Sequence, residues 1–397
     1  MPWRECRKMD EKLKFVARYL EGEKIAALCR EFGISRVTGH KIIDRYKEFG
    51  LTALTDRSRR PYRQANQLPI QVEQAILQIK QEKPHWGAPK IRERLSRKFP
   101  DLRIPAKSTV HSILDRNGLV NARKRRRTSR AEGTLLSAPE RPNELWCVDF
   151  KGEFTMGNKQ YCYPLTVTDQ VSRYLIACEG LESTKEDPTI AVFESIFKEY
   201  GLPAAIRSDN GVPFASPNSL FNLSKLSVWW LRLGIEIERI KPGNPQQNGR
   251  HERMHLTLKK QTTKPAGKNL LQQQAKFDEF IHEYNFERPH QALGMKLPSE
   301  IYQPSNRPYV GLSEVEYPFH DLEIIVTTCG RICVRNKKVN FSHVFAGQKV
   351  GIKEVDDRIW LVSFMGYDLG YFDEDSCRVE PMAENPFGSK VLSVSSV

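Results

Sequence analysis

The chain has 397 residues, of which 39% are hydrophobic and 28% are charged. At about 100–200 residues per domain, this length allows several domains and excludes a single small module. The composition is that of a globular protein, and no apolar run approaches the roughly 20 residues that a membrane-spanning helix needs. The N-terminal stretch also lacks the continuous apolar segment of a signal peptide. We therefore expect a cytoplasmic protein that does not span a membrane.

The eight cysteines are scattered along the chain, mostly beside apolar residues. Cys329 and Cys333 stand close together, but no second pair of Cys or His follows at the spacing of a zinc site. We expect reduced thiols rather than disulfides or metal ligands.

Positive charge is concentrated in the first third of the chain. The net charge is +14, but residues 1–130 contain 32 Lys and Arg against 14 Asp and Glu, a net charge of +18, which leaves −4 for residues 131–397. A region this basic attracts polyanions, and each Lys or Arg that neutralises a phosphate releases condensed counterions. Nucleic acid is therefore the first partner to consider, although a solubilising surface would carry the same charge.

Residues 9–49 have the pattern of three helices, with a break at Gly33 between the second and the third. Apolar residues at helical spacing can face one small core, Gly33 can supply a sharp turn, and Ser35 can cap the third helix. This pattern is typical of a helix-turn-helix, although a plain three-helix bundle would share it. In a helix-turn-helix the outer face of the third helix enters the major groove of DNA. That face carries Arg36, Thr38, His40 and Lys41.

A second helical unit is predicted over residues 70–120, with its last helix capped by Ser108 and ended by Gly118. Two similar units in tandem would read two adjacent stretches of DNA and so lengthen the recognised sequence. Lys107 and His111 are the candidate DNA contacts in this unit.

Two basic linkers are predicted, over residues 56–69 and 121–142. Their charge suits a path along phosphates or in the minor groove, and a solvated, unstructured tether is compatible with it. The candidate DNA contacts in the linkers are Arg57, Arg59, Arg60, Arg125 and Arg126.

The remainder of the chain changes character twice. From Asn143 to about residue 305, short strand-like runs alternate with helical ones, which predicts an α/β domain. From about Leu322 the chain consists of short strands with turn signals, which favours a small β-barrel-like domain over residues 318–382. The expected fold is thus multidomain α/β: two all-α units over residues 1–55 and 70–120, an α/β domain over 143–305 and a small β domain at the end.

Three acidic residues in the α/β domain stand in unusual settings. Asp149 interrupts an apolar strand, Asp209 lies where a strand gives way to a Gly turn, and Glu252 begins a helix after a loop rich in Pro and Gly. Each could separately be a capping, turn or helix-dipole carboxylate. Two strand ends and a helix start can also converge on one point, where carboxylates suit Mg²⁺ and two ions about 4 Å apart can assist phosphoryl transfer.

The helix that begins near Glu252 offers further candidates. Glu252, His255 and Lys259 have the i, i+3, i+7 spacing of one helix face. This face can present one metal ligand together with two side chains for DNA contact.

Several motifs resemble the integrase core of bacterial insertion-sequence transposases, relatives of retroviral integrases with a ribonuclease H-like fold. They are Trp-x-x-Asp, Arg-Ser-Asp-Asn-Gly and Pro-Gln-x-Asn-Gly-x-x-Glu-Arg-x-His-x-x-x-Lys, in this order. Tyr284-Asn, Arg288-Pro-His, Ala292-Leu-Gly and Pro298-x-x-x-Tyr302 resemble the segment that closes this core, and His85-Trp-Gly-Ala-Pro-Lys-Ile resembles the N-terminal region of the group. The resemblance covers about residues 10–305.

This resemblance implies that Asp149, Asp209 and Glu252 are the catalytic DDE triad and bind two Mg²⁺ ions, with Mn²⁺ as a substitute. It implies a polynucleotidyl transferase that binds the terminal inverted repeats of its own element, cleaves DNA 3′ ends and joins them to target DNA. The expected assembly is a homodimer or a larger homo-oligomer, cytoplasmic and nucleoid-associated when bound to DNA. The alternatives are a catalytically silent DNA-binding regulator derived from a transposase and a structural protein that uses its helices to bind a partner.

The chain also departs from the family in three places. Forty-two residues separate Asp209 from Glu252, which requires an insertion around Phe214–Trp229 relative to retroviral integrases. The zinc-binding N-terminal domain of those integrases has no counterpart. His251 stands where an apolar residue is frequent in the family. It could contact DNA, but we expect it to be solvated.

Overall fold

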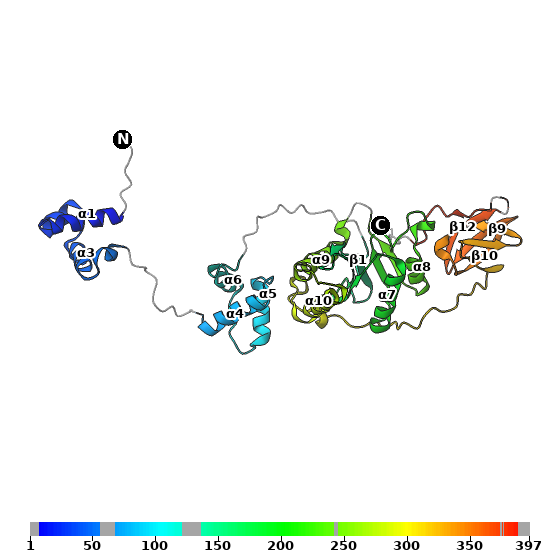
Figure 1. Ribbon diagram of the computed structural model, residues 1–397, viewed down its shortest axis with the longest axis horizontal. Helices are drawn as coiled ribbons and strands as arrows, with labels where there is room; N and C mark the ends of the chain where they lie inside the picture. Colours follow the sequence, from blue (N-terminus) through cyan, green and yellow to red (C-terminus); the bar gives the residue numbers. More distant parts are fainter. Residues whose placement is uncertain are drawn as a thin grey trace, which may run out of the picture. The chain divides into compact units, whose positions relative to one another are not determined.

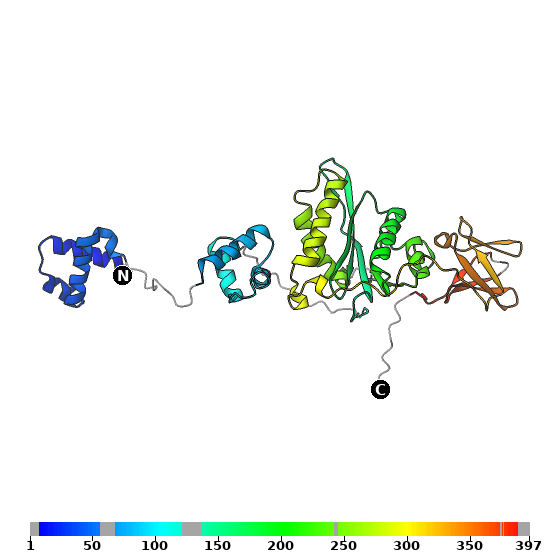
Figure 2. The same cartoon turned by 90° about the horizontal axis from the view of Figure 1, so that it is seen from below.

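The computed structural model describes residues 8–55, 68–120, 136–241, 245–373, 375 and 377–387. The chain divides into two compact units, Met1–Ile70 and Gln71–Val397. Figures 1 and 2 show the ribbon from two directions. In the ranges that the structure describes, no helix is long and apolar enough to cross a membrane.

The first unit contains the predicted three helices and a short 3₁₀ turn. They are α1 (Lys8–Leu20), α2 (Ile25–Glu31), α3 (Arg36–Phe49) and the turn Gly50–Leu54. The backbone of Gly33 has φ +65°, which favours glycine, and the Ser35 hydroxyl accepts a hydrogen bond from the Thr38 N–H as the N-cap of α3. Gly39 is buried because α3 crosses close to Cys29, whose sulfur a side chain at this position would meet. The predicted turn and cap of the helix-turn-helix are confirmed.

The second helical unit also contains three helices, as predicted. They are α4 (Ile70–Glu82), α5 (Ala88–Lys98) and α6 (Lys107–Arg116). Ile76, Ile91 and Val110, one from each helix, are fully buried. Gly118, at φ +68°, follows the end of α6 as expected. The prediction that Ser108 caps this helix is wrong, because α6 begins one residue earlier and Ala106 is its N-cap.

The central domain has a mixed sheet in the strand order β2-β3-β1-β5-β6, with β4 also paired to β3. Strand β1 pairs antiparallel with β3 and parallel with β5, and β5 pairs parallel with β6. The strands are β1 (Leu145–Phe150), β2 (Phe154–Thr155), β3 (Tyr161–Asp169), β4 (Leu175–Leu181), β5 (Ala205–Ser208) and β6 (Glu236–Arg239). Four strands, one of them the two-residue β2, thus precede the first helix of this domain.

Helices cover both faces of this sheet. In Figures 1 and 2, α7 and α8 lie on one side of it, and α9 and α10 lie on the other. The helices are α7 (Glu186–Tyr200), α8 (Lys225–Arg232), α9 (Gly249–Thr262) and α10 (Leu270–His282), and α10 continues into the π-helical turn η4 (Glu283–Glu287). Because side chains alternate along a strand, Trp146 and Val148 pack into the core with Phe193 of α7, and Asp149 points to the opposite face, where α9 lies.

The segment expected as an insertion between Asp209 and Glu252 contains α8. Its Trp230 is fully buried and stacks on Phe214, with ring centroids 6.2 Å apart. The insertion therefore contributes to the hydrophobic core of the domain.

The C-terminal strands form an open sheet. The five-stranded antiparallel sheet has the order β13-β12-β11-β10-β7, and β8 and β9 form a separate hairpin. The strands are β7 (Leu322–Ile325), β8 (Arg331–Val334), β9 (Lys337–Asn340), β10 (Lys349–Asp356), β11 (Ile359–Phe364), β12 (Tyr367–Asp373) and β13 (Glu380–Pro381). The expected β-barrel-like domain is not confirmed, because β7 and β13 lie at opposite edges of the sheet and do not close it in the described part of the chain.

Candidate active site and nucleic-acid interface

The three predicted carboxylates come from the ends of neighbouring elements. Asp149 is the next-to-last residue of β1, Asp209 directly follows β5, and Glu252 lies in the first turn of α9. Since β1 and β5 are parallel neighbours, their carboxyl ends lie at the same edge of the sheet. The charges of Asp209 and Glu252 both act on Asp149, so the three side chains face a common region.

Electrostatics at this edge favour a cation. Burial, followed by the negative charges of Asp209 and Glu252, raises the pKa of Asp149 to about 7, although the Phe150 N–H and Lys151 act in the opposite direction. Among the residues that the structure describes, no three His, Cys, Asp or Glu side chains form a ready metal site. The donor set consists of carboxylates that repel one another, which is the oxygen chemistry that a hard divalent cation prefers.

Asp209 is held by the turn that follows β5. Its Oδ1 accepts a hydrogen bond from the Gly211 N–H at 3.1 Å, and the Asn210 side chain donates to the Ile240 carbonyl at 2.7 Å. A Cβ at Gly211 would lie 3.0 Å from Asp209 Oδ2. The Asp-Asn-Gly sequence thus orients the carboxylate at the end of the strand.

A buried hydrogen-bond network lies behind Asp149. The hydroxyl of Thr166, which stands opposite Asp149 in the β1–β3 pairing, donates to the Asp149 carbonyl at 3.0 Å. It also lies 2.7 Å from Nε2 of His251 and 2.7 Å from Nε2 of His255. A hydroxyl has one proton, so both imidazoles carry their proton on Nε2 and donate to Thr166. Nδ1 of His251 then accepts from the Thr168 hydroxyl at 2.8 Å.

The two histidines are neutral parts of the interior. Burial and the charge of Lys151 lower the pKa of His255 to about 3, and burial and His255 lower the pKa of His251 well below its ordinary value. The expectation that His251 is solvated is wrong, because the residue is 1% exposed. His255 is 8% exposed, and its Nδ1 lies 3.9 Å from Oδ2 of Asp149, so it stands beside the carboxylates; its contact with DNA stays a prediction.

Sequence reasoning missed Thr166, Thr168 and Lys151. The signal for the two threonines was their alternation on β3, together with the i, i+4 spacing of His251 and His255 on α9. Lys151 follows β1, and burial and the charge of Lys259 lower its pKa, so positive charge also lies beside Asp149. Lys259 is exposed, as a DNA contact requires.

The candidate DNA contacts in the helical units lie on exposed helix faces. On α3 the buried Gly39 and Ile43 face the core, and on α6 the buried Val110, Ile113 and Leu114 do so. The exposed candidates are Arg36, Thr38, His40 and Lys41 on α3, and Lys107 and His111 on α6. Arg57, Arg59, Arg60, Arg125 and Arg126 lie outside the described residues, and the role of all these side chains stays a prediction.

Charged contacts join the second helical unit to the central domain. Glu283 accepts hydrogen bonds from Lys83 at 2.9 Å, from the Trp86 indole N–H at 3.2 Å and from Gln261 at 3.0 Å. Lys83 also lies 3.0 Å from Glu287. The His-Trp motif of the second unit therefore faces the end of α10 and, through Gln261, the end of α9.

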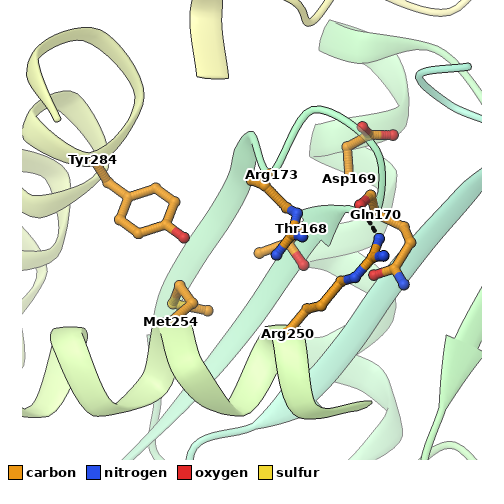
Figure 3. Close-up of a pocket in the computed structure, with 7 residues that line it drawn as sticks. All are labelled: Thr168, Asp169, Gln170, Arg173, Arg250, Met254 and Tyr284. Atoms are coloured by element: carbon orange, nitrogen blue, oxygen red, sulfur yellow. Dashed lines mark hydrogen bonds between the residues drawn. The ribbon is translucent and has the colours of Figure 1, made fainter. Parts of the chain in front are cut away.

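A small pocket adjoins the histidine network at Thr168. Figure 3 shows the residues that line it: Thr168, Asp169, Gln170, Arg173, Arg250, Met254 and Tyr284. Thr168 belongs both to this pocket and to the histidine network, and Arg250 Nη1 donates to the Gln170 carbonyl at 3.3 Å. The pocket is thus adjacent to the first turn of α9, which carries Glu252.

Family models match most of the helical and central regions. Models of an integrase core domain match residues 139–245 and 233–298, a homeodomain-like domain matches residues 38–114, and a helix-turn-helix domain matches residues 11–62.

Relatives include proteins of mobile elements. The chain is 24% identical over 290 residues to the 39.2 kDa protein of insertion element IS476 from Xanthomonas euvesicatoria, covering 71% of this chain and 79% of the relative. It is 27% identical over 201 residues to the 31.7 kDa protein of insertion element IS407 from Burkholderia multivorans, covering 48% and 67%. It is 33% identical over 124 residues to the Pol polyprotein of Radiation murine leukemia virus, covering 31% and 20%.

Among solved structures, the magnesium complex of the HTLV-2 integrase catalytic core domain matches with 17% identity and a TM-score of 0.33, covering 41% of this chain and 98% of that one. The simian T-cell lymphotropic virus intasome matches with 13% identity and a TM-score of 0.37, covering 74% and 97%. The family models and the sequence relatives agree with the resemblance drawn from the motifs: the chain carries an integrase core domain behind N-terminal helix-turn-helix domains, as insertion-sequence transposases of the DDE superfamily do.

Proposed function

We propose that this protein is a DDE transposase that binds the terminal inverted repeats of its own element, cleaves DNA 3′ ends and joins them to target DNA. The observation that carries the proposal is the convergence of Asp149, Asp209 and Glu252 at one sheet edge, where burial, followed by the charges of Asp209 and Glu252, raises the pKa of Asp149 to about 7. A site that concentrates negative charge in this way is stabilised by divalent cations.

Asp149, Asp209 and Glu252 would hold the metal, with two Mg²⁺ ions expected and Mn²⁺ as a substitute. When bound, the ions would stabilise the attacking and leaving oxygens of an in-line phosphoryl transfer and neutralise its developing charge. The turn at Gly211 orients the Asp209 carboxylate, and the histidine network holds the backbone of Asp149 through Thr166. Catalysis by positioning requires that the protein hold these residues in a fixed geometry.

The reaction consists of two displacements at phosphorus. Water attacks the phosphodiester at the 3′ end of the element, the bond from phosphorus to the 3′ oxygen breaks, and a 3′ hydroxyl is left. This hydroxyl then attacks a phosphodiester of the target DNA and displaces the target's own 3′ oxygen, which leaves as a new hydroxyl. Lys259, on the exposed face of α9, would position the DNA end, and no covalent intermediate between protein and DNA is required.

DNA binding is assigned to the two helical units and the basic linkers. The exposed side chains of α3 and α6 would read the two halves of a terminal repeat, and the linker arginines would contact phosphates between them. Two DNA ends must meet during insertion, so we expect a homodimer or a larger homo-oligomer, cytoplasmic and nucleoid-associated when bound to DNA.

A cleavage and joining assay tests the proposal. The purified chain is incubated with Mg²⁺ and a labelled duplex that carries the terminal repeat, and the wild type is compared with Asp209→Asn, with Asp187→Asn and with wild type in EDTA. Asp187 is exposed in the first turn of α7, away from the three carboxylates, so Asp187→Asn makes the same chemical change outside the site and serves as the control. We expect cleaved and joined products from the wild type and Asp187→Asn alone, with repeat binding retained by Asp209→Asn. Repeat binding without any cleavage by a folded wild-type protein would instead favour the regulator.

A further inference from the structure

Two cationic side chains, Arg173 and Arg250, line the pocket of Figure 3, and three more, Lys90, Arg253 and Arg288, lie near it. They come from four separate segments: the turn between β3 and β4, helix α9, the segment after η4, and helix α5. Burial, followed by the charge of Arg250, lowers the pKa of Arg173. Burial, followed by the charges of Arg288 and Arg253, lowers the pKa of Lys90 to about 7. We call Lys90, Arg173, Arg250, Arg253 and Arg288 the cation cluster.

Buried nitrogen atoms in and around the cation cluster have no partner. Nε of Arg173, Nη1 of Arg288 and Nε2 of His290 are buried without a hydrogen bond among the described residues. His290 packs against Tyr284, with ring centroids 4.7 Å apart, and Tyr284 lines the same pocket as Arg173. The Arg173 and Arg288 nitrogens are N–H donors. A buried donor without an acceptor costs free energy, so these two groups are suited to an acceptor that the chain does not supply.

The nearby carboxylates are already engaged elsewhere. Asp169 lines the pocket, but Figure 3 shows its carboxylate turned away from the arginines. Its oxygens accept hydrogen bonds from the Asn143 N–H at 2.8 Å and from the Ser172 N–H and hydroxyl at 2.7 and 2.6 Å. Glu283 also acts on Lys90, but it accepts from Lys83, Trp86 and Gln261. The cluster therefore has excess positive charge.

We propose that the cation cluster binds phosphate groups of the DNA backbone. Guanidinium groups match the oxygens of a phosphate in both charge and geometry, and Tyr284, whose hydroxyl points toward Arg173 in Figure 3, adds a neutral donor. This inference rests on the proposed function in one respect, that DNA is the ligand of the central domain.

The position of the cluster favours DNA over a small free anion. Arg250 and Arg253 are exposed and flank Glu252 in the first turns of α9, whereas Lys90 belongs to the second helical unit. The cations thus extend from the end of the sheet that carries the three carboxylates toward a helical unit that we expect to bind DNA. This arrangement suits a DNA strand, which can place more than one phosphate along it. A strand bound there would lead from the repeat-binding helices to the carboxylates.

The test measures the salt dependence of DNA binding by the full chain. A fluorescent duplex of unrelated sequence is titrated in EDTA, so that catalysis does not contribute, and the logarithm of the binding constant is plotted against the logarithm of the salt concentration. Each phosphate contact contributes about 0.9 to the slope of this plot. The double variant Arg250→Gln/Arg253→Gln replaces two exposed side chains, and the single variant Arg288→Gln replaces a half-buried one. The control is Lys198→Gln, whose side chain is 61% exposed on α7, on the opposite face of the sheet.

We expect the double variant to reduce the slope by about one to two and Arg288→Gln by about one, with no change for Lys198→Gln. Unchanged slopes in the folded double variant would overturn the proposal. A second arm compares the melting temperature in inorganic phosphate and in chloride at equal ionic strength. Stabilisation by phosphate that the variants lose, with unchanged DNA slopes, would assign the cluster to a free phosphate and would also overturn it. The binding measurement does not depend on the cleavage and joining assay. Failure of the proposed phosphate binding is therefore distinguishable from failure of the proposed transposase activity.

Discussion

Nδ1 of His255 lies 3.9 Å from Oδ2 of Asp149. Because the Thr166 hydroxyl accepts the Nε2 proton of His255, the nitrogen that faces Asp149 carries a lone pair. The same hydroxyl donates to the Asp149 carbonyl, so one threonine fixes both the backbone of the carboxylate residue and the imidazole beside it. Strand β3 thus positions the strand that carries Asp149 and the helix that carries Glu252.

Two substitutions of Thr166 distinguish the effect of its hydroxyl from the effect of its size. Thr166→Val leaves two buried N–H groups and one carbonyl without their partner, at a cost of about 1–3 kcal/mol for each group that stays unsatisfied. Thr166→Ser keeps the hydroxyl. We expect the valine variant to unfold at lower urea concentration and to lose DNA joining, and the serine variant to retain most of both. Equal joining by the two variants at a temperature where both are folded would contradict the role of the hydroxyl.

Asp149→Asn is expected to stabilise the protein while abolishing joining. The pKa of Asp149 is raised to about 7 in the folded state, above its ordinary value of 3.8, so the folded state loses stability as pH rises from 3.8 through 7. A neutral amide removes this loss. The melting temperature of the variant should therefore exceed that of the wild type at pH 8, by about 2–4 °C for each kcal/mol regained, and the difference should shrink at pH 5.

Magnesium provides the complementary measurement on the same pair of proteins. A ligand that binds only the folded state raises the melting temperature, so Mg²⁺ should stabilise the wild type and EDTA should reverse the effect. The Asp149→Asn variant should show a much smaller shift, and Asp187→Asn should behave as the wild type. Equal Mg²⁺ shifts in all three proteins would contradict the assignment of Asp149 as a ligand.

The buried pair of Arg207 and Glu238 supports strand β5, which Asp209 directly follows. Their side chains are 3% and 6% exposed, and Ser137 contributes its hydroxyl to Glu238 and its carbonyl to Arg207. Arg207→Met leaves a buried carboxylate without its cation, which typically costs about 3–5 kcal/mol. We expect a lower urea midpoint for this variant and partial recovery for Arg207→Met/Glu238→Leu. If the double variant is as unstable as the single one, the cost lies in packing rather than in unpaired charge.

Local patterns in the sequence predict the elements and three of the site residues. Gly33 and Ser35 mark the turn and cap of α3, and Asp149 and Asp209 stand out because they end apolar strands. These features depend on neighbours in sequence. The open C-terminal sheet was not predicted, since alternating strands with turns between them do not determine whether the first and last strands pair.

Contacts between distant residues account for what the sequence did not reveal. Thr166 and His251 are 85 positions apart, and each is unremarkable in its own segment: a threonine on a β-strand and a polar residue in the first turn of a helix. His251 was expected to be solvated because nothing in α9 itself indicates that β3 supplies two hydroxyl partners. The cation cluster likewise comes from four segments, and no single segment carries an unusual charge pattern.

His251 makes stability depend on pH in a direction that can be measured. Burial, followed by the charge of His255, lowers its pKa well below 6.5, so the unfolded chain takes up a proton at this residue below pH 6.5 and the folded chain does not. The wild type thus loses stability as pH falls below 6.5, at up to about 1.4 kcal/mol per pH unit. His251→Gln lacks this loss, so its deficit in urea midpoint relative to the wild type should shrink between pH 7.5 and pH 5. A constant deficit for His251→Gln would show that its imidazole is not held neutral.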